Sequence, residues 1–341
     1  MNINVPILDK GYKVLVKCPT YNHSKFICDA LNGFSIQETN FPFICIVVDD
    51  ASKDGNQNVI KQYANENCDM SNAEISEDDI STYIRVSHKT NSNCDFLFCL
   101  LKVNLYCKPE KQEIYKPYRA VCEYEAICEG DDYWIYQKKL QMQVVYLDSH
   151  PECGLVYAKS KVFVQQNNRF RRNCIGSDVS DIKKLIFRND ICTLTTCFRQ
   201  SYMKDYILDP EIIKKSREWK LGDYPMWLWI VCQYSAHFID TEVSVYRILN
   251  ESISHSNDIR KVIAYNQSVL DIRHFFIKKF NLPKELYDLV NEEYNGRMGL
   301  CYLMTHNYKS AIDCMKILSL ENKIKIIREY TKNIISNFLS R

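Results

Sequence analysis

The chain has 341 residues, of which 46% are hydrophobic and 25% are charged, and these proportions are typical of a globular protein with a substantial core. The formal net charge of +2 at pH 7 argues against a general nucleic-acid-binding protein. The amino terminus lacks a signal-peptide pattern, and no stretch approaches the ~20 apolar residues of a membrane span. We therefore expect a cytoplasmic protein.

The 16 cysteines contain no CxxC pair. Several lie within apolar runs such as FICIVV, where cysteine behaves as a small hydrophobic residue. These spacings favour free thiols in a reducing compartment over a structural metal or a disulfide framework.

The first half of the chain alternates between apolar strands and amphipathic helices. YKVLVKCP at residues 12–19 and FPFICIVVDD at residues 41–50 are expected strands, because each is a short apolar run followed by turn residues. HSKFICDALNGFSIQ between them has apolar residues at helical spacing, and NQNVIKQYANEN from residue 56 predicts a second helix. This order indicates a parallel sheet with helices on both faces.

The middle of the chain is less regular. The polar stretch 65–82 is expected to be a surface excursion, and CDFLFCLLKVNLY from residue 94 fits either a helix or a strand. YRAVCEYEAIC at residues 118–128 is an expected strand that leads into the acidic sequence EGDDYW. Farther on, QKKLQMQVVYLDSHP and LGDYPMWLWIVCQYS predict helices, and GLVYAKSKVFVQ, ICTLTTCFRQS and AHFIDTEVSVYRI predict strands.

Strand patterning disappears near residue 256, and segments with helical spacing follow. We therefore expect an α/β domain at residues 1–256 and a helical region at residues 257–341. The last segment, ENKIKIIREYTKNIISNFLSR, is amphipathic and basic. We expect it to pack on its own domain, and a peripheral contact with the inner face of a membrane is the alternative.

Polar and acidic side chains follow three of the expected strands, in CPTYN, VVDDASKDG and CEGDDYW. In an open parallel sheet, ligands bind beyond the carboxyl ends of the strands. One acidic turn can be explained by the preference of aspartate for turns, but two at strand ends indicate a ligand-binding edge.

CPTYNHSKFICDAL, VVDDASKDG and EGDDYW, in this order, resemble the nucleotide-sugar-binding half of the family-two inverting glycosyltransferases. LGDYPMWLWIV resembles their acidic motif before the acceptor-side helix, and VYRILNESISHS resembles the strand and loop that close the site in bacterial members. The resemblance spans Tyr12 to Ser256. It implies an α/β GT-A fold, in which a Rossmann-like, mostly parallel central sheet has helices on both faces, here followed by a helical C-terminal extension.

The resemblance also implies a reaction, which is the metal-dependent inverting transfer of a sugar from a nucleotide-sugar donor to a hydroxyl group. The expected donor is a UDP-sugar, and the expected acceptor is a glycan or lipid-linked saccharide in cell-surface polysaccharide synthesis. A divalent ion, Mn²⁺ or Mg²⁺, would clamp the diphosphate. Glu129 and Asp131 occupy the acidic positions of the Asp-x-Asp motif, and His255 is a further candidate metal ligand. The candidate nucleotide-sugar-binding residues are Thr20, Tyr21, Asp49, Asp50, Asp132, Arg199 and Arg247.

Asp223 is the candidate catalytic base, since an inverting transfer needs a carboxylate to remove the proton of the acceptor hydroxyl. Members of the family commonly have Glu-Asp at this motif, whereas here the pair is Gly222-Asp223, so only the aspartate carries over. The alternative is a helix cap, because Pro225 indicates that a helix starts immediately afterwards. Turn formation and helix capping are the corresponding alternatives for the acidic motif and for VVDD.

Two features depart from the family pattern. Glu123 and Glu125 precede the acidic motif where the family has small residues, and residues 91–116 are hard to align. Donor affinity or loop shape is therefore expected to differ. A catalytically silent nucleotide-sugar-binding or scaffold module is the alternative function, although the candidate base and the acidic motif together argue against it. A nucleotidyltransferase would need a glycine-rich phosphate loop, which CPTYNHSK lacks.

Overall fold

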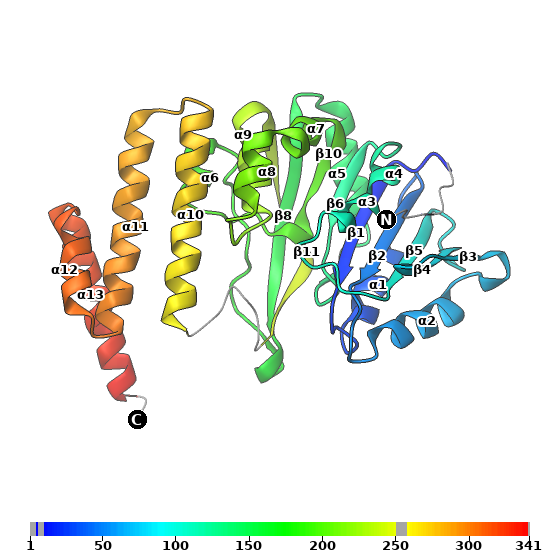
Figure 1. The fold of residues 1–341 in the computed structure, drawn as a ribbon, viewed down its shortest axis with the longest axis horizontal. Helices are drawn as coiled ribbons and strands as arrows, with labels where there is room; N and C mark the ends of the chain where they lie inside the picture. The colour runs from blue at the N-terminus through cyan, green and yellow to red at the C-terminus, as the bar shows by residue number, and fades with distance from the viewer. Residues whose placement is uncertain (1–4, 6–9, 250–257, 340–341) are drawn as a thin grey trace. The chain divides into compact units, whose positions relative to one another are not determined.

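The computed structural model describes residue 5, residues 10–249 and residues 258–339, with side chains described as far as residue 332 (Figure 1). Two compact units are assembled from interleaved parts of the chain. The first unit comprises Met1–Asp181, Asp190–Asp205 and Gln233–Leu249, and the second comprises Ile182–Asn189, Tyr206–Cys232 and Asn250–Arg341. The expected domain boundary at residue 256 lies outside the described residues and stays a prediction.

The first unit is built on a mixed sheet. Among the described residues it has 11 strands in the order β3-β4-β5-β2-β1-β6-β10-β8-β11-β7, with β9 paired to β8 (Figure 1). The strands are β1 (Val14–Thr20), β2 (Phe43–Asp49), β3 (Glu74–Glu77), β4 (Ser81–Ser87), β5 (Cys94–Leu101), β6 (Tyr124–Ile127), β7 (Tyr133–Trp134), β8 (Cys153–Val164), β9 (Arg169–Phe170), β10 (Cys197–Arg199) and β11 (Ser235–Ile248). The central strands β5, β2, β1 and β6 are parallel, so their carboxyl ends meet at one edge.

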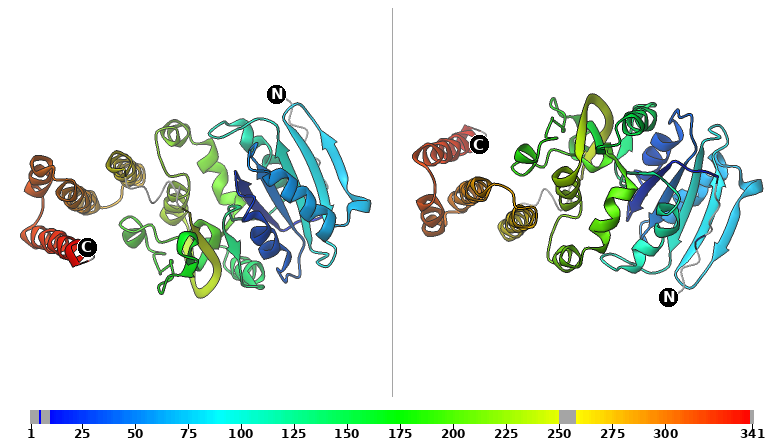
Figure 2. Two further views of the ribbon diagram at one scale, coloured as in Figure 1. Left: turned by 90° about the horizontal axis from the view of Figure 1, so that it is seen from below. Right: turned by 90° about the horizontal axis from the view of Figure 1, so that it is seen from above.

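Helices connect the strands and make up most of the second unit. They are α1 (Ile27–Ser35), α2 (Asn56–Asn67), α3 (Glu110–Glu113), α4 (Lys116–Arg119), α5 (Lys139–Ser149), α6 (Ile182–Leu185), α7 (Gln200–Leu208), α8 (Pro210–Ser216), α9 (Tyr224–Gln233), α10 (Ile259–Lys279), α11 (Lys284–Met304), α12 (Tyr308–Lys316) and α13 (Leu320–Leu339). Helix α11 packs against α10, α12 and α13 (Figure 2). The expected C-terminal helical region is confirmed.

The sheet is covered on both faces because side chains alternate along each strand. Val14, Val16 and Cys18 of β1 join the buried cluster that includes α1, α2 and α5. Leu15 points to the other face, where it joins residues of the 105–122 segment, which contains α3 and α4. Burial of each large aliphatic side chain stabilises the fold by roughly 1.5–3 kcal/mol. Strong burial of β1 and β2 therefore fixes the turns that follow them.

Three expectations for the middle of the chain are refined. Residues 94–101 form the strand β5, and all of its residues are buried between β2 and β4. Tyr118 and Arg119, expected as the start of a strand, belong instead to α4, which has Pro117 in its first turn. The surface excursion at 65–82 contains the exposed edge strand β3. The conformation of β3 and β5 depends on pairing with neighbouring strands, so local sequence patterns did not predict it.

All 16 cysteines are free thiols, as expected. Within the described ranges, no helix has both the length and the apolar character needed to cross a membrane.

Candidate functional site

The turns after β1, β2 and β6 lie together at the carboxyl edge of the parallel strands. Thr20 at the end of β1 pairs with Asp49 at the end of β2. The Asp50 N–H donates to the Thr20 carbonyl at 3.0 Å, and the Gly130 N–H donates to the Pro19 carbonyl at 3.0 Å. The structure therefore brings the PTYN, VVDD and EGDD sequences to one place.

The Asp49 side chain is buried and holds the turn after β2. Its Oδ1 accepts from the Ser52 N–H at 3.0 Å and from Gln57 Nε2 at 2.8 Å. Its Oδ2 accepts from Asn56 Nδ2 at 2.7 Å, and the same amide donates to Thr20 Oγ1 at 3.1 Å. Both carboxylate oxygens are thus engaged within the chain, as the turn interpretation anticipated, and Asp49 shapes the site by fixing the start of α2.

Asp50 is also buried, with 2% of its surface exposed, and it is covered by a segment that the sequence could not align. Its Oδ1 accepts from the Leu105 N–H at 2.5 Å, and its Oδ2 lies 2.8 Å from Lys111 Nζ. Asn104 Nδ2 donates to the Asp50 carbonyl at 2.9 Å. At the same edge, Tyr21 is 42% exposed and offers an accessible aromatic face.

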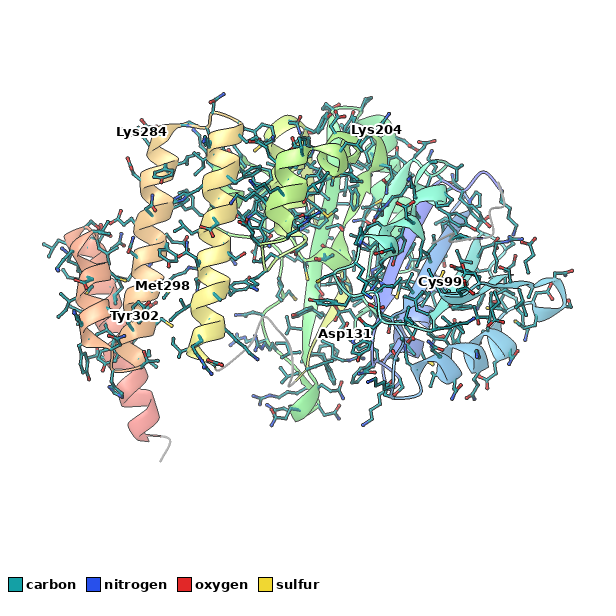
Figure 3. The ribbon with its side chains drawn as sticks, viewed as in Figure 1. Cys99, Asp131, Lys204, Lys284, Met298 and Tyr302 are labelled. Carbon is teal, nitrogen blue, oxygen red and sulfur yellow. The ribbon has the colours of Figure 1, made fainter. Side chains whose placement is uncertain are left out.

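The loop between β6 and β7 gathers Glu129, Asp131 and Asp132. Asp131 is labelled in Figure 3, and 25% of its side chain is exposed. Asp132 is buried, and its Oδ1 accepts from the Arg247 N–H at 2.7 Å. Burial raises the pKa of Asp132 well above its usual value, the charges of Asp131 and Glu129 add to this, and Arg247 opposes it. Carboxyl groups crowded in this way favour the approach of a cation.

Arg247 fixes this acidic loop from the neighbouring strand β11. One guanidinium nitrogen donates to the Asp131 carbonyl at 2.6 Å, and another lies 2.7 Å from Asp29 Oδ2 on α1. The guanidinium carbon also lies 4.7 Å from the Phe26 ring centroid and 5.0 Å from that of Tyr133. The predicted donor contact of Arg247 stays untested, and we propose that this residue positions the loop.

Arg199 is not brought to the acidic loop. It pairs with Tyr124 at the amino end of β6, because β10 runs antiparallel to β6. Its guanidinium donates to the Leu147 carbonyl at 2.6 Å and to the Tyr124 hydroxyl at 3.3 Å. In Figure 3, Lys204 of the following helix α7 is labelled near the top of the view, and Asp131 is labelled well below it. We therefore leave Arg199 out of the proposed donor site.

His23 belongs to this edge, although sequence reasoning did not select it. Its Nδ1 lies 3.3 Å from Thr20 Oγ1, and its Nε2 lies 3.8 Å from Asp131 Oδ2. Burial lowers the pKa of His23, whereas the charge of Asp131 raises it. The sequence signal that could have identified His23 is its position two residues after Tyr21, in the same turn. The other histidine candidate, His255, lies outside the described residues.

The carboxylates of the acidic loop suit a metal ion that is also bound by a ligand. They do not form a complete set of protein ligands around a metal ion. Among the described residues, no group of three or more His, Cys, Asp or Glu side chains is arranged to hold a metal ion. Magnesium-like ions are commonly bound by one or two carboxylates together with substrate phosphates. Asp131 offers a partly exposed carboxylate of this kind, and Glu129 lies two residues before it in the same loop.

Gly130 allows the acidic loop to approach β1 closely. A Cβ atom at this position would lie 2.5 Å from Thr20 Oγ1 and 2.6 Å from Thr20 Cβ. We expect Gly130→Ala to destabilise the protein by about 1–3 kcal/mol, because the loop or β1 must shift. Urea denaturation measures the change in the free energy of unfolding.

Gly296→Ala is the matched control, since its Cβ would meet only Ile326 Cδ1 at 3.7 Å. It lies within α11, where alanine is favoured over glycine by roughly 0.5–1 kcal/mol. Equal stability of the Gly130→Ala protein and the wild type would contradict the close packing of the loop.

Asp223 lies in the second unit and begins helix α9. Its Oδ1 accepts from the Tyr224 N–H at 2.8 Å, and its carbonyl accepts from the Trp227 N–H at 3.2 Å. Burial raises the pKa of Tyr206 and of Tyr265, and the negative charge of Asp223 adds to both shifts. This contact with the start of α9 is the capping geometry that the sequence offered as the alternative role, and the role of Asp223 as a base stays a prediction.

A buried arginine holds the start of α9 from helix α10. Tyr224 donates its hydroxyl toward the Leu185 carbonyl at 3.0 Å, and Arg273 Nε donates to the same hydroxyl oxygen at 3.4 Å. Arg273 also donates to the Phe187 carbonyl at 2.6 Å and pairs with Glu293 of α11. The C-terminal helices thereby fix the segment that carries Asp223.

Arg273→Leu is expected to destabilise the protein by roughly 2–4 kcal/mol, because it leaves a carbonyl and a tyrosine hydroxyl without their donor and Glu293 without its partner. Chemical denaturation measures this change. Arg297→Leu is the control, because Arg297 pairs with the same glutamate but is 59% exposed, so we expect a loss below about 1 kcal/mol. Similar losses for both variants would show that the Arg273 network adds little.

Known proteins with a similar sequence match only part of this chain. No protein-family profile matches the sequence. The chain is 30% identical over 191 residues to uncharacterized proteins of Mycobacterium bovis and Mycobacterium tuberculosis, and the match covers 55% of this chain and 47% of each relative. The chain thus spans about half the length of the curated relatives it matches.

Two solved structures have a similar fold. Residues 1–349 of TarS from S. aureus, in complex with UDP, align with a TM-score of 0.50 and 18% identity over 84% of this chain and 71% of that chain. The mannosyltransferase PcManGT from Pyrobaculum calidifontis, in complex with GDP-Man and Mn²⁺, aligns with a TM-score of 0.55 and 14% identity over 94% of this chain and 80% of that chain. The chain has a mixed α/β fold similar to that of glycosyltransferase structures and contains a C-terminal helical region, so the predicted fold class is confirmed.

Proposed function

We propose that this protein is a metal-dependent inverting glycosyltransferase that moves a sugar from a nucleotide-sugar donor to a hydroxyl group. One observation carries the proposal. The three polar turns after β1, β2 and β6 converge at the carboxyl edge of a parallel sheet, within a fold that glycosyltransferases share. This edge is where open α/β sheets bind their ligands.

The donor would occupy the carboxyl edge. Tyr21 is accessible enough to flank the nucleobase, and the buried residues Thr20 and Asp50 would hold the turns beside the nucleoside. Asp131 and Glu129 would hold a divalent ion, which supplies charge neutralisation for the leaving diphosphate. A UDP-sugar is the donor we propose. TarS and PcManGT were solved with UDP and with GDP-Man respectively, so both nucleotides are worth testing.

Asp223 is the proposed base. Its carboxylate would accept the proton of the acceptor hydroxyl while the hydroxyl oxygen forms a bond to the anomeric carbon. The bond between that carbon and the diphosphate breaks, and its electron pair leaves with the nucleotide. Attack from the face opposite the nucleotide gives inversion.

The proposed acceptor is a glycan or a lipid-linked saccharide in surface polysaccharide synthesis. Helix α13 offers a feature that suits work at the inner face of a membrane. Its Ile324 and Ile327 are 41% and 52% exposed, and basic side chains including Lys323, Lys325 and Arg328 lie between and beside them. An exposed apolar stripe with lysine and arginine is typical of helices that bind anionic lipid surfaces.

A thermal-shift screen tests the proposed donor. UDP-sugars and GDP-sugars are added with and without MnCl₂, and we expect a cognate donor to raise the melting temperature only when the metal is present. Ligand at 100 times its dissociation constant adds about 2.7 kcal/mol of stability. Release of free nucleotide on addition of acceptor tests transfer itself. Binding without release under any condition would favour a catalytically silent module, and no shift with any nucleotide would contradict the proposal.

A further inference from the structure

The face of the sheet beneath the acidic loop carries charged side chains in a layer that is otherwise apolar. Glu125 of β6 is 1% exposed and is bound by Arg119 of α4, with Arg119 Nε 2.8 Å from one carboxylate oxygen and a terminal nitrogen 3.0 Å from the other. Gln200 also donates to this carboxylate. The charge of Glu125 is therefore satisfied by a bidentate arginine pair and an amide.

Lys17 lies on the same face but has no such partner. Its Nζ lies 5.2 Å from the ring centroid of Tyr115, and the Arg119 guanidinium carbon lies 5.4 Å from the same centroid. Over the part of the chain that the structure describes, no oxygen accepts a hydrogen bond from Lys17 Nζ, and the buried hydroxyl of Tyr115 also has no hydrogen-bond partner. The Lys17 ammonium group therefore lies over an aromatic ring, and no protein carboxylate is hydrogen-bonded to it within the described residues.

The main chain of Lys17 lies against the start of the acidic loop, because its carbonyl accepts from the Cys128 N–H at 3.0 Å. Lys17 is partly exposed, although Val16 and Cys18 on either side of it are fully buried. Burial lowers the pKa of Lys17 to about 8, and the charged groups that act on it include Glu129 of the acidic loop and Lys111, the partner of Asp50. Glu129 belongs to the acidic loop, and Lys111 belongs to α3 and pairs with Asp50 in the turn after β2.

We propose that Lys17 binds the diphosphate of the nucleotide donor through its ammonium group. This inference rests on the proposed function. A single divalent cation leaves a nucleoside diphosphate with residual negative charge, and a lysine ammonium is a compact partner for phosphate oxygens. Arg119 is a second cation near Lys17, but its bidentate pair with Glu125 already occupies its guanidinium group, so it does not compete for the phosphate.

The test compares nucleotides with nucleosides. Lys17→Met keeps the apolar stem and removes the charge. By isothermal titration calorimetry with MnCl₂ present, we expect the affinity for UDP or GDP, whichever the wild type binds, to fall by roughly 10–100-fold. The affinity for the matching nucleoside is expected to stay the same. Lys61→Met, an exposed lysine of α2, controls for the loss of one positive charge and is expected to bind like the wild type.

Two results would overturn the inference while leaving the proposed function standing. One is equal affinity of the Lys17→Met protein and the wild type for the diphosphate. The other is an equal loss of affinity for the nucleotide and for the nucleoside, which would show that Lys17 contacts the nucleoside and not the diphosphate. A wild type that binds no nucleotide would overturn the proposed function as well.

A second measurement needs no variant, in case Lys17→Met fails to fold. The wild-type protein is acetylated at lysines, and the modified residues are read by mass spectrometry. We expect the diphosphate to protect Lys17 from acetylation and the nucleoside to leave it reactive, because only the diphosphate covers the amino group. Equal labelling of Lys17 with and without the diphosphate would contradict the inference.

Discussion

Asp223→Asn is expected to abolish sugar transfer and to leave donor binding intact. The amide keeps an oxygen that can accept from the Tyr224 N–H, so the start of α9 is preserved. It cannot take the proton of the acceptor hydroxyl, and loss of a general base typically lowers the rate by about 10²–10⁴-fold. Nucleotide release in the presence of acceptor gives kcat, and calorimetry gives the donor affinity.

The control for this experiment is Asp288→Asn, which makes the same change at an exposed position of α11. It is expected to behave like the wild type in both measurements. A normal kcat for the Asp223→Asn protein would show that Asp223 acts only as the residue that precedes and caps α9. A loss of donor affinity without a change in kcat would also contradict its role as base.

Asp131→Asn is expected to remove the gain in donor affinity that Mn²⁺ provides. The backbone of this loop is held by Arg247 through the Asp131 carbonyl, so the side chain can be changed without releasing the loop. A neutral amide is a poorer ligand for a hard dication, and we expect a loss of at least about 10–100-fold in metal-dependent affinity. Calorimetric titration of the nucleotide with MnCl₂ and with EDTA measures the gain.

The wild type in EDTA provides the reference state, because the Asp131→Asn protein with MnCl₂ should match it. Asp205→Asn, at an exposed position of α7, is the control for the loss of one carboxylate and should keep the full gain. An undiminished effect of Mn²⁺ in the Asp131→Asn protein would assign the metal to other groups.

Local sequence patterns were sufficient for the edge that carries the candidate site. Apolar runs predicted β1, β2 and the strand before EGDD, and the turn residues after them marked their carboxyl ends. Since parallel strands share one edge, convergence of Thr20, Asp49 and the acidic loop followed from those assignments alone.

Long-range pairing decided what local patterns missed. Arg199 lies at the carboxyl end of its strand, but β10 is antiparallel to β6, so this arginine lies at the opposite edge of the sheet. The partners of Asp50 come from residues 104–111, more than 50 positions away. Arg247 reaches Asp29 over a separation of 218 residues. No spacing within a short window encodes such contacts.

The interleaving of the two units was equally hidden. Residues 206–232, which contain Asp223, cluster with the C-terminal helices and not with the sheet that precedes and follows them. The signal lies in buried side chains such as Arg273, whose partners are drawn from α6, α9 and α11 or their immediate neighbours. A charged residue on a helix is more often exposed, so the sequence alone does not mark Arg273 as buried.

The most direct test of the account locates the cation itself. Crystals grown with MnCl₂ and UDP are measured at a wavelength where manganese scatters anomalously. The account predicts one strong peak about 2 Å from a carboxylate oxygen of Asp131 or Glu129 and from a diphosphate oxygen. Manganese and nucleotide bound together at a site remote from the loop after β6 would contradict it.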